Sequence, residues 1–314
     1  MFKIQKTGPV SKFEPLFWLF AFLSVARFPS FPLELINHYT LHLFFLSFLF
    51  YIKVDRKRRL LTCLIQLFLL YRLYNSLSVN HSADFLQNRE SLNLYCANIL
   101  VGNSKVEKTL QFLEESDYDV VVLIETWPEL HQRLNSLKRF PYRVYLEHPL
   151  NFSLAVLSRT EIQETARPSY GHREIPWLEL YLPHWKFHLF AIHAPPPMNS
   201  RWLEERDKVL HLAASRLASK SGLLAGDFNL TPYAPLFQDL IGVHGLKSSR
   251  PMSSWKGTWP SFLGPFGIPI DHILTTSDIL TSQYEVNSIP GSDHHSISLR
   301  VQLAGSDEQL LQQE

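Results

Sequence analysis

The stretch LLAGDFN, residues 223–229, carries an apolar run through Gly226 into Asp227 and Asn229. Such a run is typical of a buried strand, and the glycine with the polar pair after it is typical of the turn that ends one. A carboxylate at the end of a buried strand is unfavourable unless it is paired or holds a cation. The stretch therefore predicts a sheet whose strand ends carry chemistry.

The same pattern recurs along the chain. Apolar runs lead into a polar group in LNLYCAN (92–98), DVVVLIE (119–125), LFAIH (189–193) and PIDHIL (269–274), and GSDHH (291–295) precedes the last strand-like run. The polar residues at these ends are Asn98, Glu125, His193, Asp227, Asn229, Asp271, Asp293 and His294. Strand ends on one rim of a sheet converge in space, so we expect these side chains to meet.

Each of these residues also has a purely structural interpretation. Asp227 and Asn229 suit an Asx turn after Gly226, and Asp271 suits the cap of a neighbouring backbone amide. His193 is compatible with a hydrogen-bonded core histidine, and Glu125 with the start of a loop. Ionisable clusters indicate function only statistically, so the argument rests on their joint occurrence in this order.

Short strand-like runs and amphipathic helices alternate from residue 91 onward. We predict helices over Ser104–Ser116, with a capping box at Ser104 and Glu107, over Trp127–Phe140 and over Trp202–Leu217. Further strands are predicted at residues 142–146, 153–157, 177–182 and 186–193, and three more at the C-terminal end. Two stacked sheets with helices on their outer faces are the packing that this order favours.

The first 89 residues have a different composition. Three apolar segments, Phe13–Ala26, Leu33–Val54 and Leu60–Val79, surround the basic turn Asp55–Arg59. The last two approach the length of a membrane span, and the basic turn predicts the cytoplasmic side of a helical hairpin. We expect a multi-pass membrane anchor of two to three helices over residues 1–89, with the following residues outside the cytoplasm. The alternatives are a cleaved first segment and a buried hairpin of a soluble protein.

Charge is distributed unevenly between the two parts. The whole chain carries +1, residues 1–89 carry +7, and the remainder therefore carries −6. A nucleic-acid-binding domain usually presents a basic patch, so tight unassisted DNA binding is disfavoured without being excluded. Cys63 and Cys96 lie in apolar runs and predict neither a disulfide nor a thiolate metal site.

The ordered series resembles the endonuclease/exonuclease/phosphatase superfamily. The resemblance runs from about Leu92 to Leu303 and rests on Asn98, the IET with Glu125, the LAVLSR run to Arg159, the His193 strand, GDFN, IDHIL and SDHHS. It implies a four-layered α/β sandwich, with two mainly antiparallel sheets, over residues 90–304 and a polar tail over 305–314. The helical hairpin, the HAPPP after His193 and Thr258-Trp259-Pro260 are also similar to bacterial membrane proteins of the VanJ type.

The resemblance further implies a role for each residue. One divalent ion, Mg²⁺ or Mn²⁺, is expected at Glu125 with Asn98 and Asp293. His294 is expected to act on the scissile phosphate, oriented by Asp271. Asp227 orients or deprotonates the attacking water, Asn229 donates to the phosphate, and His193 is a second donor. Arg159 is the best candidate for a phosphate clamp, with strand capping as its alternative.

These expectations lead to a bacterial membrane phosphohydrolase acting outside the cytoplasm on a phosphate or pyrophosphate ester, such as a lipid-linked one. Its expected partners are the phosphorylated substrate and the bilayer, and no protein partner is inferred. The alternatives are an extracytoplasmic nuclease and a scaffold with an inactive site. The aromatic loop with Trp255, Trp259 and Phe262 is interpreted either as local packing or as a contact with membrane or substrate.

Overall fold

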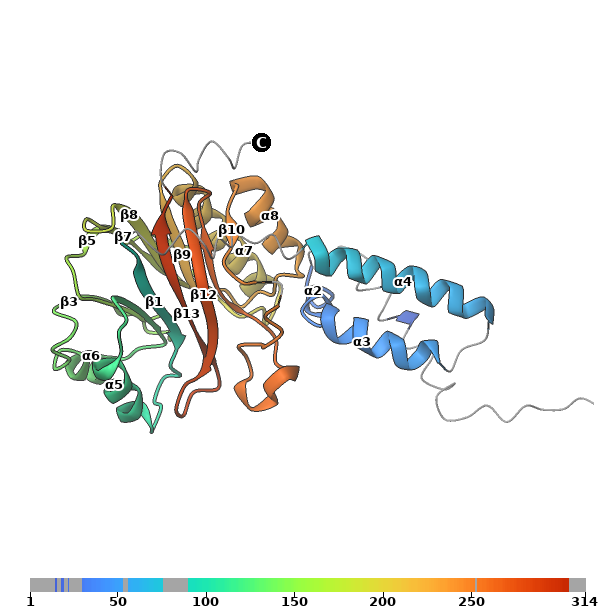
Figure 1. Cartoon of the computed structure of the whole chain (residues 1–314), viewed down its shortest axis with the longest axis horizontal. Helices are drawn as coiled ribbons and strands as arrows, with labels where there is room; N and C mark the ends of the chain where they lie inside the picture. Colours follow the sequence, from blue (N-terminus) through green and yellow to red (C-terminus); the bar gives the residue numbers. More distant parts are fainter. Residues whose placement is uncertain are drawn as a thin grey trace, which may run out of the picture.

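The computed structural model describes residues 30–52, 56–75, 90–251 and 253–304, with four isolated residues before residue 30. Its main body contains two sheets packed face to face, with helices on the outside (Figure 1). The predicted polar tail over 305–314 and most of the predicted segment Phe13–Ala26 lie outside the described residues.

The first sheet has six strands in the order β12-β13-β1-β2-β4-β3. Only β1 and β2 pair in parallel, so the sheet is mainly antiparallel as predicted. Its strands are β1 (Leu92–Asn98), β2 (Val120–Ile124), β3 (Tyr142–Leu146), β4 (Leu154–Ser158), β12 (Ile279–Ser288) and β13 (His295–Leu303).

The second sheet has seven strands, six of them in the order β10-β11-β9-β8-β7-β5, with β6 paired to β7. Here β8 and β9 are the parallel pair. Its strands are β5 (Gln163–Ala166), β6 (Ser169–Tyr170), β7 (Ile175–Leu182), β8 (Phe187–His193), β9 (Gly222–Asp227), β10 (Lys247–Ser248) and β11 (Asp271–Thr275). The short strands β5, β6 and β10 were not predicted, because they lack a periodic apolar pattern.

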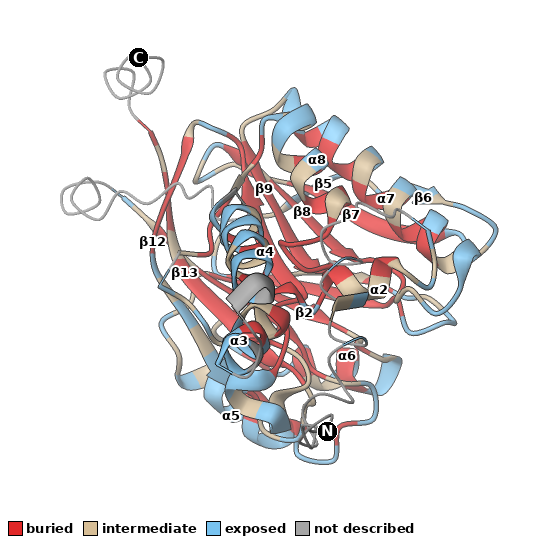
Figure 2. Ribbon diagram, turned by 90° about the vertical axis from the view of Figure 1, so that its right-hand side faces the viewer, coloured by how far each residue is buried: buried red, intermediate tan, exposed pale blue. Residues whose placement is uncertain are grey.

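Alternation along the strands explains the four layers. In β1, Leu94 and Cys96 face the core between the sheets, whereas Tyr95 and Ala97 face a second core on the outer side. The outer helices are α5 (Val106–Glu115) and α6 (Pro128–Leu134) on one sheet, and α7 (Ser200–Ala218) and α8 (Pro235–His244) on the other. Figure 2 shows that the central strands are buried, while α5, α7 and α8 keep exposed residues on their outer side, as do the edge strands β5 and β12 along part of their length.

The capping box predicted at Ser104 and Glu107 is wrong. Helix α5 begins at Val106, and its cap residue Lys105 makes no side-chain capping bond. Asn103 organises this turn instead, because its Oδ1 accepts from the backbone N–H of Lys105 at 2.8 Å and its Nδ2 donates to Ile99 O at 3.0 Å.

The predicted hairpin is present, but the segment Leu33–Val54 is not one helix. It is divided into α2 (Glu34–Asn37) and α3 (Thr40–Tyr51), and α3 packs against α4 (Arg56–Asn75). Figure 1 shows α3 and α4 projecting from the sandwich, with α2 at the junction. Among the described residues, none of the helices combines the length with the apolar character needed to cross a bilayer.

An irregular segment follows β10. Residues 251–270 contain the short helix η2 (Ser261–Phe266) and an isolated bridge between Trp259 and Ile268. The backbone N–H of Ser261 donates to Asp293 O at 2.7 Å, so this segment is attached directly to the turn before β13.

Candidate active site

The ends of four strands place their polar side chains on one rim between the two sheets. Asp227 pairs in register with His193 across β9–β8 and with Asp271 across β9–β11. His193, Asp227 and Asp271 share the parity of the strand residues that face the core between the sheets, as does Asn98 at the end of β1. Side-chain alternation therefore directs all four toward the same space.

Gly226 allows β9 to approach β8 closely. It has a φ of +153°, and a Cβ at this position would lie 1.8 Å from the carbonyl oxygen of Ile192. Any side chain there would push the strands apart and disturb the register between His193 and Asp227. The glycine in GDFN is thus required by packing, and it positions the aspartate that follows.

Glu125 lies in the site although it is not part of a strand. It follows β2 with a left-handed φ of 59°, which interrupts the alternation of the strand. The Nδ2 of Asn98 donates to Glu125 Oε1 at 2.9 Å and to Asp227 Oδ2 at 3.1 Å, so one amide links both carboxylates. The backbone N–H of Val101 donates to Glu125 Oε2 at 3.2 Å. These bonds hold Glu125 in the cavity.

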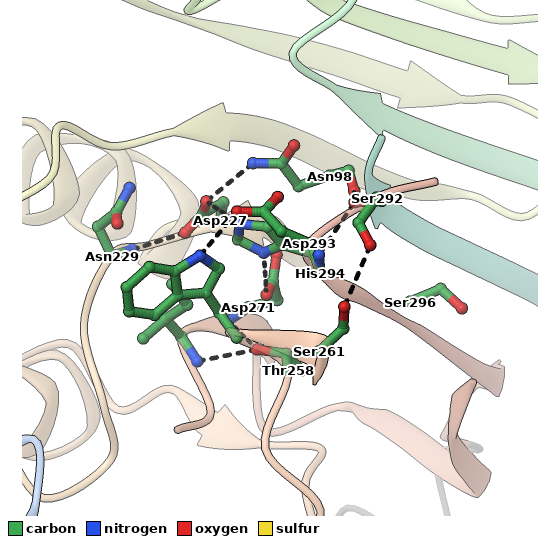
Figure 3. A network of polar contacts seen from close by, with 12 residues as sticks. Asn98, Asp227, Asn229, Thr258, Ser261, Asp271, Ser292, Asp293, His294 and Ser296 are labelled. Carbon is green, nitrogen blue, oxygen red and sulfur yellow. Dashed lines mark hydrogen bonds and ion pairs between the residues drawn. The ribbon is translucent and has the colours of Figure 1, made fainter. Parts of the chain in front are cut away.

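His294 and Asp271 form a direct buried pair, drawn in Figure 3. His294 Nδ1 lies 2.9 Å from Asp271 Oδ2, and His294 Nε2 lies 3.8 Å from Asp227 Oδ2. Burial lowers the pKa of His294, but the charge and hydrogen bond of Asp271, with the charges of Asp227 and Asp293, raise that pKa to about 10. The ring is therefore a cation near neutral pH.

The surroundings of Asp227 disfavour its charged form, because this residue is buried beside another carboxylate. Burial and the charge of Asp271 raise the pKa of Asp227 to about 8, although His294 and the bonds from Asn229 and Asn98 oppose the shift. The backbone N–H of Asn229 donates to Asp227 Oδ1 at 2.9 Å. A carboxyl with a pKa near neutrality is suited to accept a proton from water.

His193 lies beside both carboxylates. Its Nε2 is 3.7 Å from Asp227 Oδ2 and 3.9 Å from Glu125 Oε1, and its Nδ1 donates to Asn151 O at 3.0 Å. Burial lowers the pKa of His193 despite the charge of Glu125. With the proton on Nδ1, the neutral ring presents an acceptor at Nε2, so the predicted donor role belongs to the protonated form of the ring.

Asp293 completes the set from the turn before β13. Trp259 Nε1 donates to Asp293 Oδ2 at 3.0 Å, while Asp293 Oδ1 is buried without a hydrogen-bond partner (Figure 3). A buried carboxylate oxygen without a partner is costly and suits a cation. Glu125 and Asp293 line the same cavity, and their carboxylate oxygens are the hard ligands that Mg²⁺ or Mn²⁺ prefers. Asn98 directs its Nδ2 at Glu125, while its Oδ1 accepts from the backbone N–H of Leu100 at 3.1 Å, so it positions Glu125 and offers no free oxygen. Of the three predicted ligands, Glu125 and Asp293 therefore fit a divalent ion.

A second group of liganding atoms is close by. One ligand atom from each of Asp227, Asp271 and His294 lies within 4.8 Å of the others. The pairing of His294 Nδ1 with Asp271 already engages two of these residues. Among the described residues, this group and the carboxylates of Glu125 and Asp293 are thus two neighbouring sets of atoms that suit a divalent ion.

Six of the eight predicted residues line one cavity, and the other two, Asn98 and Asp271, contact them through Glu125, Asp227 and His294. The side-chain amide of Asn229 donates to Ala194 O at 2.9 Å, while its backbone N–H donates to Asp227. The cavity has a volume of about 530 Å³. Arg159 is not part of it, because it pairs with Asp119 at 3.2 Å, at the start of β2 and opposite to Glu125. Of the two interpretations of Arg159, phosphate clamp or strand capping, this contact favours capping.

The sequence did not identify several residues that line this cavity. Trp259 lies in the loop that the sequence left open between local packing and a contact with membrane or substrate, and it lines the cavity. Leu35, His38 and Tyr39 line the cavity from the N-terminal part, and no local signal announces this. Phe152 and Asn151 approach His193 from the loop before β4.

Comparisons with known proteins agree with this architecture. In solved structures, the chain is similar to an endonuclease/exonuclease/phosphatase from Beutenbergia cavernae, with 17% identity, a TM-score of 0.57 and coverage of 69% of this chain and 73% of that one. It is similar to D. rerio TDP2 complexed with a single strand DNA product, with 15% identity, a TM-score of 0.53 and coverage of 68% and 99%. It is also similar to a 3′ phosphatase from Neisseria bound to a product DNA hairpin, with 13% identity, a TM-score of 0.53 and coverage of 68% of this chain and 100% of that one.

These structures share the fold with this chain. No curated protein sequence matches the chain significantly. Residues 93–294, well over half of the chain, match the model of the Endonuclease/Exonuclease/phosphatase family, and the strand-end site lies within this range. The chain therefore belongs to the endonuclease/exonuclease/phosphatase family, whose members hydrolyse phosphoester bonds and generally use a divalent metal.

Proposed function

We propose that this enzyme hydrolyses the phosphate or pyrophosphate ester of a lipid-linked substrate outside the cytoplasm, anchored to a bacterial membrane by its N-terminal hairpin. The observation that carries the proposal is the composition of the cavity. The carboxylates and histidines of the strand ends share it with many apolar side chains, and none of the described residues that line it is a lysine or arginine.

The chemistry follows from the residues in place. A divalent ion held by Glu125 and Asp293 would offset the negative charge that builds on the phosphoryl oxygens. Asp227 accepts a proton from the attacking water, whose oxygen forms the new bond to phosphorus. The bond from phosphorus to the leaving oxygen breaks, and that oxygen takes a proton from solvent water. The His294 cation, oriented by Asp271, donates to the phosphoryl group.

The hairpin supports the membrane part of the proposal. Side chains of α3 and α4 leave many large apolar groups exposed, among them Phe45, Phe48, Leu49, Leu64 and Leu67. Exposed apolar surface on this scale indicates a contact with a membrane or another protein. The basic Arg56–Arg59 lies at the tip of the hairpin, and α4 rises about 30 Å over its 20 residues.

The apolar hairpin and the cavity composition favour a lipid substrate over nucleic acid. A polyanionic strand is normally bound through several lysines and arginines, and these are lacking among the described cavity residues. The nuclease alternative is nevertheless motivated by the DNA in two structures that share this fold. One assay separates the two functions.

The test uses the full chain in detergent micelles, supplied with Mg²⁺ or with a chelator. We expect Mg²⁺-dependent phosphate release from a polyprenyl pyrophosphate and no cutting of plasmid DNA. Asp227→Ala should abolish the release with a similar melting curve, while Asp119→Asn, at the far end of β2, should retain it. Plasmid cutting that needs Asp227, without release from the lipid, would establish the nuclease instead.

A further inference from the structure

The segment before the catalytic domain forms one wall of the active-site cavity. Leu35 of α2, together with His38 and Tyr39 in the turn before α3, lines the same space as Glu125 and Asp293. This segment is about fifty residues upstream of β1, and Figure 1 shows α2 at the junction between the hairpin and the sandwich. The cavity is thus built from both parts of the chain.

A buried ion pair fixes this wall to the catalytic domain. Arg206 in α7, whose side chain is 0% exposed, donates from Nη2 to Glu34 Oε1 at 3.0 Å. Its Nη1 donates to Asn229 O at 3.1 Å, so one guanidinium joins α2 to the loop that follows GDFN. Arg206 also pairs with Asp207 at 2.8 Å, and Glu34 with His38 at 3.1 Å, so these buried charges are satisfied together only while α2 stays against α7.

His38 adds a second attachment. Its Nε2 lies 3.1 Å from Glu34 Oε2, and its Nδ1 accepts from the backbone N–H of Thr231 at 3.3 Å. Arg72 of α4 also donates to Tyr233 O at 2.6 Å. The wall therefore has a defined position relative to the strand-end site, and its side chains can select what enters.

The two faces of the cavity mouth are apolar. Leu35 and Tyr39 stand on the N-terminal wall, while Met198 and Trp202 line the cavity from the segment around the start of α7. Met198 is 67% exposed and Tyr39 is 47% exposed, which places both at the opening. The next large apolar groups exposed along the chain are Phe45 and Leu46 of α3, six and seven residues after Tyr39, so the exposed apolar surface of the hairpin begins close to the opening in the sequence.

We propose that Leu35 and Tyr39, with Met198 and Trp202 facing them, bind the apolar chain next to the phosphate, and that the N-terminal segment thereby determines which phosphoesters are accepted. This inference rests on the proposed function and specifies its substrate class: an ester with an unbranched or polyprenyl chain adjacent to the phosphate. Charged or strongly hydrated groups at the same position would lose solvation without gaining a partner.

The test compares phosphate esters of increasing chain length, from butyl to dodecyl phosphate, using the full chain in micelles. Each methylene that enters the cavity should raise kcat/KM about fourfold through a lower KM, until the apolar walls are filled. Leu35→Ser should lower the ratio of kcat/KM for dodecyl phosphate to kcat/KM for butyl phosphate about tenfold or more, because the longer chain makes more contacts with the apolar wall.

Leu46→Ser is the matched control, because Leu46 is 41% exposed on α3 and does not line the cavity. It removes the same side chain from the same hairpin and should leave the ratio between the two substrates unchanged. An equal loss in both variants would show that the hairpin acts only by partitioning into the micelle, and would overturn the proposal. An equal loss for both substrates in Leu35→Ser would show a merely structural role and would also overturn it.

Leu35→Trp provides a second, independent variant. It fills the cavity instead of opening it, so the ratio of kcat/KM for dodecyl phosphate to kcat/KM for butyl phosphate should fall at least tenfold. A single-stranded oligonucleotide serves as the competing probe, because Tyr39, Trp202 and Trp259 could stack on bases. If the oligonucleotide is cleaved and depends on Tyr39, the wall binds bases and the proposal fails. Mg²⁺-dependent hydrolysis of butyl phosphate, which needs no apolar wall, tests the proposed function separately.

Discussion

Asp271→Asn tests the electrostatics of the site most sharply. The substitution keeps the size of the side chain and an oxygen that can accept from His294 Nδ1, now 2.9 Å from the carboxylate. It removes the negative charge that, with the hydrogen bond, opposes the effect of burial on the pKa of His294. The pKa of His294 should therefore fall from about 10 toward and below the ordinary histidine value of 6.5.

The size of the effect on catalysis follows from the role of the ring. A positioned general acid or base contributes about 10² to 10⁴ in rate, which corresponds to about 3 to 5 kcal/mol of transition-state stabilisation. We expect kcat/KM of Asp271→Asn at pH 7.5 to be lower than that of the wild type by a factor of about 10² to 10⁴. The alkaline limb of its pH profile should also move to lower pH, because the variant loses the His294 cation earlier.

The assay is the pH dependence of kcat/KM between pH 5 and 10 with saturating Mg²⁺, on the short-chain ester. Asp119→Asn provides the control, because Asp119 pairs with Arg159 at the opposite end of β2 and should give the wild-type profile. An Asp271→Asn profile with an unchanged alkaline limb would refute the reasoning, whatever the size of the rate loss.

Three further predictions follow from the same contacts. Glu125→Gln should weaken Mg²⁺ binding at least about tenfold, read from Mg²⁺-induced thermal stabilisation, and an unchanged Mg²⁺ dependence would remove Glu125 from the ligand set. Trp259→Phe keeps an aromatic ring but removes the hydrogen bond to Asp293 Oδ2, which is worth about 1.5 to 3 kcal/mol to the positioning of that carboxylate. We expect weaker metal binding and a lower kcat in a protein that still folds. In the chelated protein, the pKa of Asp227 is raised to about 8 and that of His294 to about 10, so the folded state holds protons that the unfolded chain releases. The Tm should therefore fall between pH 6 and pH 9, and Asp227→Asn should make this fall smaller. A Tm that rises with pH would contradict the prediction.

The rim of the site could be predicted because it depends on local rules. Apolar runs that end in Asn98, His193 and Asp227 are strands, strands alternate their faces, and parallel neighbours bring their ends together. The four layers follow from the same periodicity. These inferences need no knowledge of how distant segments meet, which is why the sequence was sufficient for them.

The remaining parts depend on tertiary contacts that no local pattern encodes. The wall of Leu35 and Tyr39 exists because Glu34 reaches Arg206, about 170 residues later in the chain. Trp259 reaches Asp293 through an irregular segment whose path is set by backbone bonds to Ile268 and the turn before β13. The helix start at Val106 was misplaced because Asn103, not Ser104, organises the turn.

The central claim is that side chains from widely separated strand ends hold a single catalytic divalent ion. Anomalous scattering from crystals of the full chain grown with Mn²⁺ tests it directly. The account predicts one Mn²⁺ in the cavity, bound by carboxylate oxygens of Glu125 and Asp293. An ion bound by Asp227 and the His294 ring instead, or an active protein with no ion in the cavity, would contradict it.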